Sequence, residues 1–246
     1  MSKKESRTKV KRVTYNSIDE RYDPKILDSY DPKAYFHYDD IKRLEKMNEK
    51  YRTNRELQMT DIGTYSISEP DIANWITENI INMYMFYSEK KNTKDVVIID
   101  GTAGIGGNVL SFAKQFKRVV GVELNKVHYR VLKNNVIEAL RYENVELHNM
   151  DTYNFLKNNV YDGDKEKTIF YFDPPWGGPS YKTKDLLHLT MCDMYLSKFL
   201  EFVHSSGYKY VFMNSPRNID ITELVRNTPY KNVFVKKNYV FLISFS

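Results

Sequence analysis

The sequence has few of the residues on which disulfide-rich, zinc-binding and membrane-spanning proteins depend. Cys192 is the single cysteine among 246 residues, which excludes a disulfide framework and a zinc site built from cysteines. The 5 histidines are scattered without the spacing of metal ligands. No apolar run approaches the roughly 20 residues that cross a bilayer, and the first residues lack the apolar region of a signal peptide. We therefore expect an intracellular protein of a reducing compartment, with no metal and no membrane contact.

The length favours one main domain, and the charge leaves two interpretations open. A chain of 246 residues can bury one substantial core, so we expect a single α/β domain with an appendage. The net charge of +5 comes mostly from lysine. This balance suits contact with RNA or DNA, but it is equally compatible with a solvated surface that keeps the protein soluble.

The distribution of charged and apolar residues predicts three segments. Residues 1–14 carry six basic side chains against one acidic one, and they predict a disordered arm that either follows a phosphate backbone or only adds solubility. Residues 15–67 predict a helical extension that is too short and too charged to fold alone, so it should pack on the rest of the chain. Residues 68–246 then form the main domain.

Local signals place the helices of the extension. Asp23-Pro24 and Asp31-Pro32 both have the order of a helix start, with the acid as cap and proline in the first turn. From Pro32 to about Arg55 the spacing of apolar residues predicts mostly helix. Residues 60–67 predict a loop before the helix that starts at Ser68-Glu69-Pro70.

From Val96 onward, strands and helices alternate. Near-continuous apolar runs predict strands of a parallel sheet that is buried on both faces. The expected strands cover 96–99, 119–122, 145–148, 168–172 and 210–213, with a C-terminal hairpin of 233–235 and 239–243. The expected helices cover about 108–116, 126–141 and 184–203.

Three of these strands are followed by an acidic residue. Asp100 opens a glycine-rich loop after the first strand, Glu123 ends the second, and Asp151 follows the third. An acid at the first position would repel a pyrophosphate, so the loop favours a cationic ligand such as S-adenosylmethionine over a dinucleotide. In that case Asp100 and the loop backbone bind the methionine part, Glu123 the ribose hydroxyls, and Asp151 the adenine amine. The alternative is a set of carboxylates that merely cap strand ends.

The fourth strand leads into Asp173-Pro174-Pro175-Trp176. An amino group conjugated to a heterocycle is a poor nucleophile because its lone pair is delocalised into the ring. The Asp173 carboxylate and the Pro174 carbonyl can each accept one N–H of such an amine, and the Trp176 ring can stack on the base. The alternative is a Pro-Pro turn followed by a core tryptophan.

The chain resembles the trimethylguanosine synthases, which methylate the N2 amine of the 7-methylguanosine cap of RNA. The most specific match is Asp-Pro-Pro-Trp-Gly-Gly-Pro at 173–179 with Tyr181 shortly after it. Further matches are residues 100–108, Ser66-Ile67-Ser68-Glu69, and Pro216-Arg217-Asn218. The resemblance covers about residues 50–246.

The resemblance implies a role for individual residues. Trp176 would stack on the methylated guanine, with Asp173 and the Pro174 carbonyl at its N2 amine. Stacking a cationic base on an indole adds a cation–π gain of roughly 0.5–2 kcal/mol. The implied substrate-binding residues are Trp176, Tyr181, Arg217 and Asn218, with Arg217 at the cap phosphates. The implied cofactor-binding residues are Ser68, Asp100, Gly101, Ala103, Gly104, Glu123 and Asp151.

Two departures from the family pattern qualify these roles. Some members have serine where this chain has Asp173, so this carboxylate orients the amine more than it removes a proton. Where the family supplies a phosphate-binding lysine before Ser-Ile-Ser-Glu, this chain has Gln58. Arg52 and Arg55 are the candidates for replacing it.

We therefore expect a class I S-adenosylmethionine-dependent methyltransferase of Rossmann-like α/β fold. Its sheet would have seven mostly parallel strands and end in an antiparallel hairpin, with the helical extension over the active site. The expected protein is a monomer that methylates guanine N2 of capped RNA without a metal. Two alternatives remain: a methyltransferase acting on adenine N6 or on another guanine N2 of RNA or DNA, and a cap-binding module that has lost catalysis.

Overall fold

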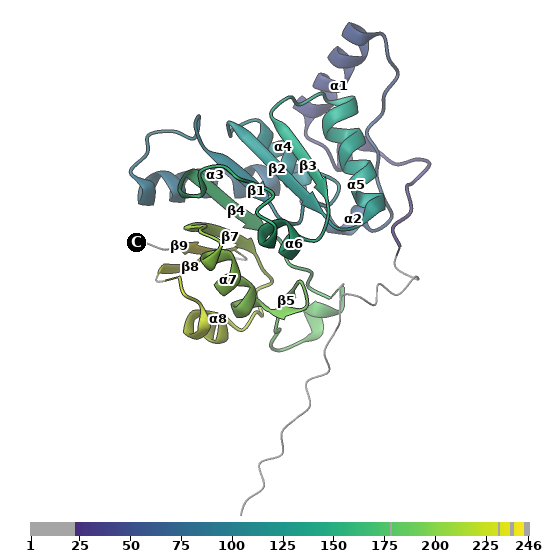
Figure 1. Ribbon diagram of the computed structural model, residues 1–246. Helices are drawn as coiled ribbons and strands as arrows, with labels where there is room; N and C mark the ends of the chain where they lie inside the picture. Colours follow the sequence, from purple (N-terminus) through teal and green to yellow (C-terminus); the bar gives the residue numbers. More distant parts are fainter. Residues whose placement is uncertain (1–22, 178, 231, 237–238, 244–246) are drawn as a thin grey trace, which may run out of the picture.

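A computed structural model describes residues 23–177, 179–230, 232–236 and 239–243 of the chain (Figure 1). The basic arm predicted for residues 1–14 lies outside this range. Within the described residues, no helix has both the length and the apolar composition needed to cross a membrane. The division at residue 67 between extension and main domain stays a prediction.

A sheet of seven strands in the order β3-β2-β1-β4-β7-β9-β8 forms the centre of the fold (Figure 1). Its strands are β1 (Val97–Asp100), β2 (Arg118–Glu123), β3 (Val145–Asn149), β4 (Thr168–Phe172), β7 (Tyr210–Asn214), β8 (Asn232–Lys236) and β9 (Tyr239–Ile243). The first five run parallel, and β9 is antiparallel to both of its neighbours. The chain builds outward from β1 to β3 and then returns to place β4 on the other side of β1. This reversal makes the β1–β4 boundary the switch point at which α/β sheets bind ligands.

Helices cover both faces of the sheet because the strand residues alternate between two cores. Ile169 and Tyr171 of β4 face one core, whereas Phe170 and Phe172 face the other. The first core is completed by α3 (Pro70–Ser88), α4 (Gly107–Ala113), α5 (Lys126–Lys133) and the π-helix η3 (Asn134–Ala139). The second is completed by α6 (Thr152–Lys157), α7 (Leu196–Ser205) and α8 (Ile221–Asn227). The mostly parallel α/β class predicted from the sequence is confirmed.

The extension contains a short 3-10 helix η2 (Pro32–Ala34), helix α1 (Tyr38–Tyr51) and the single turn α2 (Gly63–Ser66). Asp31 caps η2 as expected, accepting a hydrogen bond from the Lys33 N–H at 3.0 Å. The helix start expected at Asp23-Pro24 is wrong, because Ile26 pairs instead with Thr60 in an isolated antiparallel bridge. The loop expected at 60–67 contains α2.

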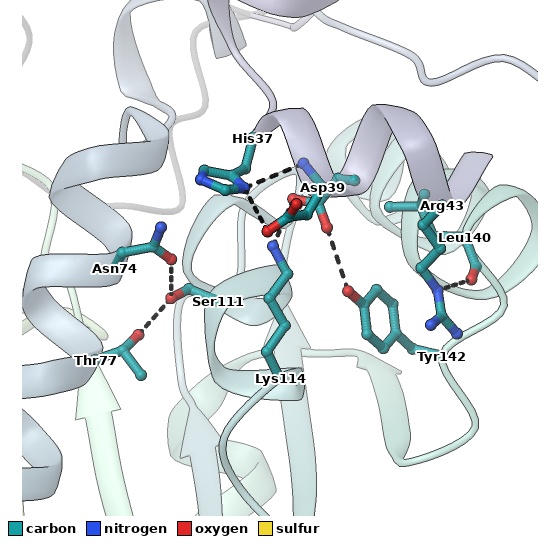
Figure 2. Close-up of polar contacts among 10 residues, drawn as sticks. His37, Asp39, Arg43, Asn74, Thr77, Ser111, Lys114, Leu140 and Tyr142 are labelled. Atoms are coloured by element: carbon teal, nitrogen blue, oxygen red, sulfur yellow. Dashed lines mark hydrogen bonds and ion pairs between the residues drawn. The ribbon is translucent and has the colours of Figure 1, made fainter. Parts of the chain in front are cut away.

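A buried ion pair holds α1 on the main body of the protein. Asp40 is 2% exposed and accepts hydrogen bonds from Lys114 Nζ, directly after α4, at 2.9 Å and from Tyr142 Oη at 3.2 Å. Figure 2 shows Lys114 and Tyr142 pointing toward the first turn of α1. One turn later, Arg43 donates to the Leu140 carbonyl at 2.5 Å and lies over the Tyr142 ring at 4.1 Å. The extension is therefore fixed by polar contacts as well as by apolar packing.

Replacing Asp40 with alanine should lower the free energy of unfolding by about 2 kcal/mol. Breaking a fully buried pair costs about 3–5 kcal/mol, and the Lys114 side chain, which is 24% exposed, recovers part of this through water. Urea unfolding measures the difference. The matched control is Asp39→Ala, one residue away and 68% exposed in its side chain, which should change stability by no more than about 0.5 kcal/mol. Equal effects of the two substitutions would contradict this assignment.

The helix expected over 184–203 is wrong in its first half. Residues 190–195 form a two-stranded hairpin of β5 (Thr190–Met191) and β6 (Met194–Tyr195), and α7 starts only at Leu196. Cys192 and Asp193 make the turn with φ values of 50° and 60°, a left-handed conformation that ends any helix. Leu187 and Leu189 are both buried, so their spacing of two reflects an extended segment packed on the core.

Candidate active site

The ends of the parallel strands bring polar residues to one edge of the sheet. Asp100 ends β1, Glu123 ends β2, and Asn214 ends β7. Asp151 lies two residues after the end of β3, and Asp173 directly follows β4. Because these strands are parallel, their carboxyl ends share one edge. The edge includes the switch point between β1 and β4.

Asp100 is a buried carboxyl with one unused oxygen. It is 1% exposed, and its Oδ1 accepts a hydrogen bond from the Thr102 N–H at 3.0 Å. Its Oδ2 is buried and has no hydrogen-bond partner among the described residues. Burial raises the pKa of Asp100 to about 8, and the nearby Asp173 and Glu123 carboxyls act in the same direction. A cationic group at Oδ2 would satisfy this oxygen and favour the ionised form.

Glu123 joins the second strand to the glycine-rich loop. Its Oε2 accepts a hydrogen bond from the Gly104 N–H at 2.8 Å, and its Oε1 accepts one from the Asn125 N–H at 2.7 Å. Burial raises the pKa of Glu123 to about 7, although both backbone contacts favour the charged form. Each oxygen has a further lone pair, so the carboxylate can still accept hydrogen bonds from two hydroxyls.

The glycine-rich loop brings the Ser68 segment next to β1. A Cβ on Gly107 would lie 2.7 Å from Ile67 Cγ1 and 3.0 Å from the Ser68 carbonyl, so only glycine allows this approach. Asn108 Nδ2 then donates to Ser68 Oγ at 3.1 Å and to Tyr171 Oη at 3.2 Å. Ser68 therefore lies beside the loop that follows Asp100, and its contact with a cofactor stays a prediction.

Other loop residues have structural contacts. The Ala103 N–H donates to the Val122 carbonyl at 2.9 Å, which joins the loop to β2. A Cβ on Gly101 would lie 3.0 Å from both the Phe170 ring and Thr152, so the chain passes close to β4 and α6 there. Gly104 has a φ of 55°, which favours glycine, and directs its N–H to Glu123.

Asp151 lies at the start of α6, against the β5–β6 hairpin. Its Oδ1 accepts a hydrogen bond from the Asn154 N–H at 3.1 Å and so caps the helix. Burial, followed by the charge of Asp151, raises the pKa of the Cys192 thiol to about 12. The β5–β6 hairpin, which the sequence does not predict, therefore lies next to Asp151.

Asp173 is attached to the loop of β1 and to the end of β7. Its backbone N–H donates to Thr102 Oγ1 at 2.7 Å, and its Oδ2 accepts from Asn214 Nδ2 at 2.9 Å. Burial raises the pKa of Asp173 to about 6, while the hydrogen bond from Asn214 opposes the rise. The carboxyl is therefore mostly ionised at neutral pH and can accept hydrogen bonds from an amine.

Trp176 and Tyr181 pack edge to face beside Asp173, with ring centroids 5.0 Å apart and an interplanar angle of 79°. Trp176 is only partly buried. Asn218 supports this arrangement, because its Nδ2 donates to the Tyr181 carbonyl at 2.9 Å and to the Lys184 carbonyl at 2.6 Å. Arg217 precedes Asn218 on the same loop and is exposed. Contact of Arg217 and Asn218 with a substrate stays a prediction.

The structure shows different surroundings for the candidate phosphate-binding residues of the extension. Arg55 forms an ion pair with Glu138 at 3.0 Å, whereas Arg52 is exposed at the end of α1. The Gln58 backbone is bound on both sides by the Asn135 side chain, at 2.7 and 3.0 Å. Both arginines are exposed, and Arg55 already has an acidic partner.

Four residues of this edge were not predicted from the sequence: Thr102, Asn108, Tyr171 and Asn214. Asn214 is 8% exposed and forms its hydrogen bond with Asp173 across two strands. Its position at a strand end is the one signal that could have identified it. Thr102 and Asn108 lie within the glycine-rich motif and Tyr171 lies in the strand before Asp173, but nothing in their spacing shows which groups they contact.

Unpartnered buried polar atoms are concentrated at this edge. Six such side-chain atoms occur among the described residues, and four are Asp100 Oδ2, Asn108 Oδ1, Trp176 Nε1 and Asn214 Oδ1. Buried polar atoms normally have hydrogen-bond partners, so a cluster of exceptions marks a place where a ligand supplies them.

A family model described as RNA cap guanine-N2 methyltransferase matches residues 95–245. The chain belongs to this family. The match begins before β1 and includes Asp100, Glu123, Asp151, Asp173 and Trp176, so the family region contains the whole polar edge except Ser68.

Individual relatives include an uncharacterised viral protein and a yeast trimethylguanosine synthase. An uncharacterised protein of Acanthamoeba polyphaga mimivirus is 36% identical over 171 residues, covering 64% of each chain. The trimethylguanosine synthase of Schizosaccharomyces pombe is 28% identical over 183 residues, covering 71% of each chain. The chain therefore spans somewhat less than two thirds of the mimivirus relative's length.

One solved structure of another protein shares the fold of this chain. A Thermus thermophilus 16S rRNA N2 methyltransferase, in complex with S-adenosylmethionine and guanosine, superposes with a TM-score of 0.50 at 16% identity. The superposition covers 74% of this chain and 45% of that one. The fold is that of the class I methyltransferases. Family membership and fold thus agree on a methyltransferase domain.

Proposed function

We propose that the protein transfers a methyl group from S-adenosylmethionine to the exocyclic N2 of 7-methylguanosine in an RNA cap. The observation that carries the proposal is the position of Asp173 and Trp176 at the β1–β4 switch point, next to the unused oxygen of Asp100. A hydrogen-bond acceptor for an amine and an aromatic ring thus lie beside a site for a cationic cofactor. Family membership supports the guanine N2 position as the target.

The acids at the strand ends are suited to S-adenosylmethionine. Asp100 Oδ2 would accept a hydrogen bond from the α-ammonium group, since it is buried and has no partner among the described residues. Glu123 would accept from the two ribose hydroxyls and Asp151 would lie at the adenine amine, with Ser68 and the backbone of the glycine-rich loop completing the site. The bound cofactor supplies the methyl group as the electrophile.

The residues after β4 orient the nucleophile. The ionised Asp173 and the Pro174 carbonyl each accept one N–H of the N2 amine, which directs the nitrogen lone pair toward the methyl carbon. Asp173 keeps its position because Asn214 and Thr102 hold its side chain and its backbone. The proton that N2 loses after methyl transfer is acidic and passes to Asp173 or to water.

The aromatic pair selects the base. The N7 methyl group makes guanine cationic, and a cationic ring stacked on Trp176 gains roughly 0.5–2 kcal/mol over a neutral one. Tyr181 supports the Trp176 ring from its edge. Arg217, on the loop after β7, would lie at the cap phosphates, and Asn218 would line the substrate side of the site. The protein should therefore require prior methylation at N7.

Methyl transfer to a panel of substrates tests this proposal. The panel contains an unmethylated cap dinucleotide, the 7-methylguanosine cap, the 7-methylinosine cap, which lacks the N2 amine, and an adenine-containing RNA. Rapid transfer to the 7-methylguanosine cap alone is expected. Preferred transfer to adenine would favour the amino methyltransferase alternative, and cap binding without any transfer would favour the inactive binding module.

Binding of S-adenosylmethionine at pH 7 should release close to one proton from Asp100, in addition to the fraction released by Glu123, whose pKa is about 7. In the free protein, the pKa of Asp100 is about 8, so the carboxyl is mostly protonated at pH 7. Pairing with the α-ammonium group favours the ionised form, which lowers this pKa and expels the proton. Calorimetry in buffers of different ionisation enthalpy measures the release. A binding heat that is independent of the buffer at pH 7 would contradict the pairing, and at a pH well above 8 the release should vanish.

A further inference from the structure

The buried side chain of Asn214 uses its NH2 group in a hydrogen bond but leaves its carbonyl oxygen without a partner in the described part of the chain. It is 8% exposed, and its Nδ2 donates to Asp173 Oδ2 at 2.9 Å. Its Oδ1 is buried and has no hydrogen-bond partner within the described part of the chain. A buried carbonyl oxygen without a hydrogen-bond partner destabilises the folded protein, which is unexpected for a residue with only a structural role.

Strand register places this amide beside the reactive amine. β4 and β7 are parallel, with Phe172 opposite Met213, so Asp173 and Asn214 emerge side by side from the edge of the sheet. The orientation of the amide is fixed, because an ionised carboxylate only accepts hydrogen bonds and must face the NH2 group. The site therefore presents two adjacent hydrogen-bond acceptors, the Asp173 carboxylate and the Asn214 carbonyl.

We propose that Asn214 determines base specificity by accepting a hydrogen bond from guanine N1–H, while Asp173 accepts one from the neighbouring N2 amine. This inference rests on the proposed function. Guanine carries the two donors N1–H and N2–H side by side, which complements two adjacent acceptors. Adenine presents a lone pair at N1 next to its N6 amine, so the Asn214 carbonyl would face another acceptor. The pair thus rejects adenine even though adenine has a similar exocyclic amine.

A comparison of two capped substrates tests the inference. The 7-methyl-2-aminopurine cap keeps the amine and the N7 charge but has an acceptor at N1 and no O6. The wild type should prefer the 7-methylguanosine cap in kcat/KM, and in Asn214→Ala this preference should shrink by about 10- to 100-fold, as expected for loss of one base-specific contact. The missing O6 affects both enzymes equally and cancels in the comparison.

The acid limb of the pH profile reports the hydrogen bond from Asn214 to Asp173 separately from the contact with guanine N1–H. Asn214 donates to the charged form of Asp173, whose pKa is about 6, so Asn214→Ala should move the acid limb of kcat/KM to higher pH. Asn214→Ser, which keeps a small donor and acceptor, provides a second variant if the alanine variant unfolds. Equal wild-type turnover on the two caps would overturn the inference whether or not the variants fold.

The outcomes separate this inference from the function on which it rests. No transfer by the wild type to the 7-methylguanosine cap would overturn both. Transfer to that cap, with the same preference for it over the 2-aminopurine cap in the wild type and in Asn214→Ala, would overturn the role of Asn214 alone. A reduced preference together with the shifted pH limb would support it.

Discussion

Trp176→Ala should lower kcat/KM for the 7-methylguanosine cap by roughly 100-fold or more. Base stacking on an aromatic side chain contributes about 1–3 kcal/mol, and the cation–π gain adds about 0.5–2 kcal/mol. Each 1.4 kcal/mol corresponds to about tenfold. The affinity for S-adenosylmethionine should stay within a factor of about three, because the acids that bind it lie at the ends of β1, β2 and β3. Steady-state kinetics and calorimetry measure the two effects.

Two further variants sharpen this prediction. Trp176→Phe keeps an aromatic face and should retain much more activity than the alanine variant. Phe86→Ala removes an aromatic side chain that is 74% exposed on α3, outside the predicted site, and should leave kcat/KM unchanged. Full turnover by Trp176→Ala on the capped dinucleotide would contradict the stacking role.

Asp100→Asn should weaken binding of S-adenosylmethionine by roughly 100-fold without destabilising the free protein. Losing one member of a buried charge pair costs about 2–5 kcal/mol. Asparagine has nearly the same shape as aspartate and keeps an oxygen for the Thr102 N–H. In the free wild type, the pKa of Asp100 rises from 3.8 to about 8, so the protein loses stability as the pH increases through this interval. The asparagine of Asp100→Asn does not ionise, so the variant avoids this loss of stability.

Calorimetric titration and thermal unfolding at neutral pH measure the two expected effects. The matched control is Asp95→Asn, which removes an acid just before β1 whose side chain is 88% exposed. It should change neither cofactor affinity nor stability appreciably. Wild-type affinity of Asp100→Asn for S-adenosylmethionine would contradict the assignment of Asp100, and a large fall in its melting temperature would contradict the stability argument.

The sequence predicts the sheet and its acidic edge because both depend on local patterns. Apolar runs identify β1, β2 and β4 as strands buried on both faces, and parallel strands necessarily share an edge at their carboxyl ends. The positions of Asp100, Glu123 and Asp173 at that edge follow without knowledge of any side-chain contact. The family resemblance adds expected roles but not the distances or the pKa shifts.

The remaining features depend on contacts between distant segments. The hydrogen bond between Asn214 and Asp173 arises from the register of β4 against β7, which apolar runs do not encode. The buried pair of Asp40 and Lys114 joins residues 74 positions apart. In the β5–β6 hairpin, local helix propensity is overridden, because the segment around Leu187 packs extended beside Ile219.

The most direct test of the central claim is nucleoside mass spectrometry of the product formed from 7-methylguanosine-capped RNA and S-adenosylmethionine. The proposed function predicts one or two added methyl groups, all on the exocyclic N2 of the cap guanine, and their loss in Trp176→Ala. Added methyl groups on adenine or on an internal guanine, with an unchanged cap, would contradict it.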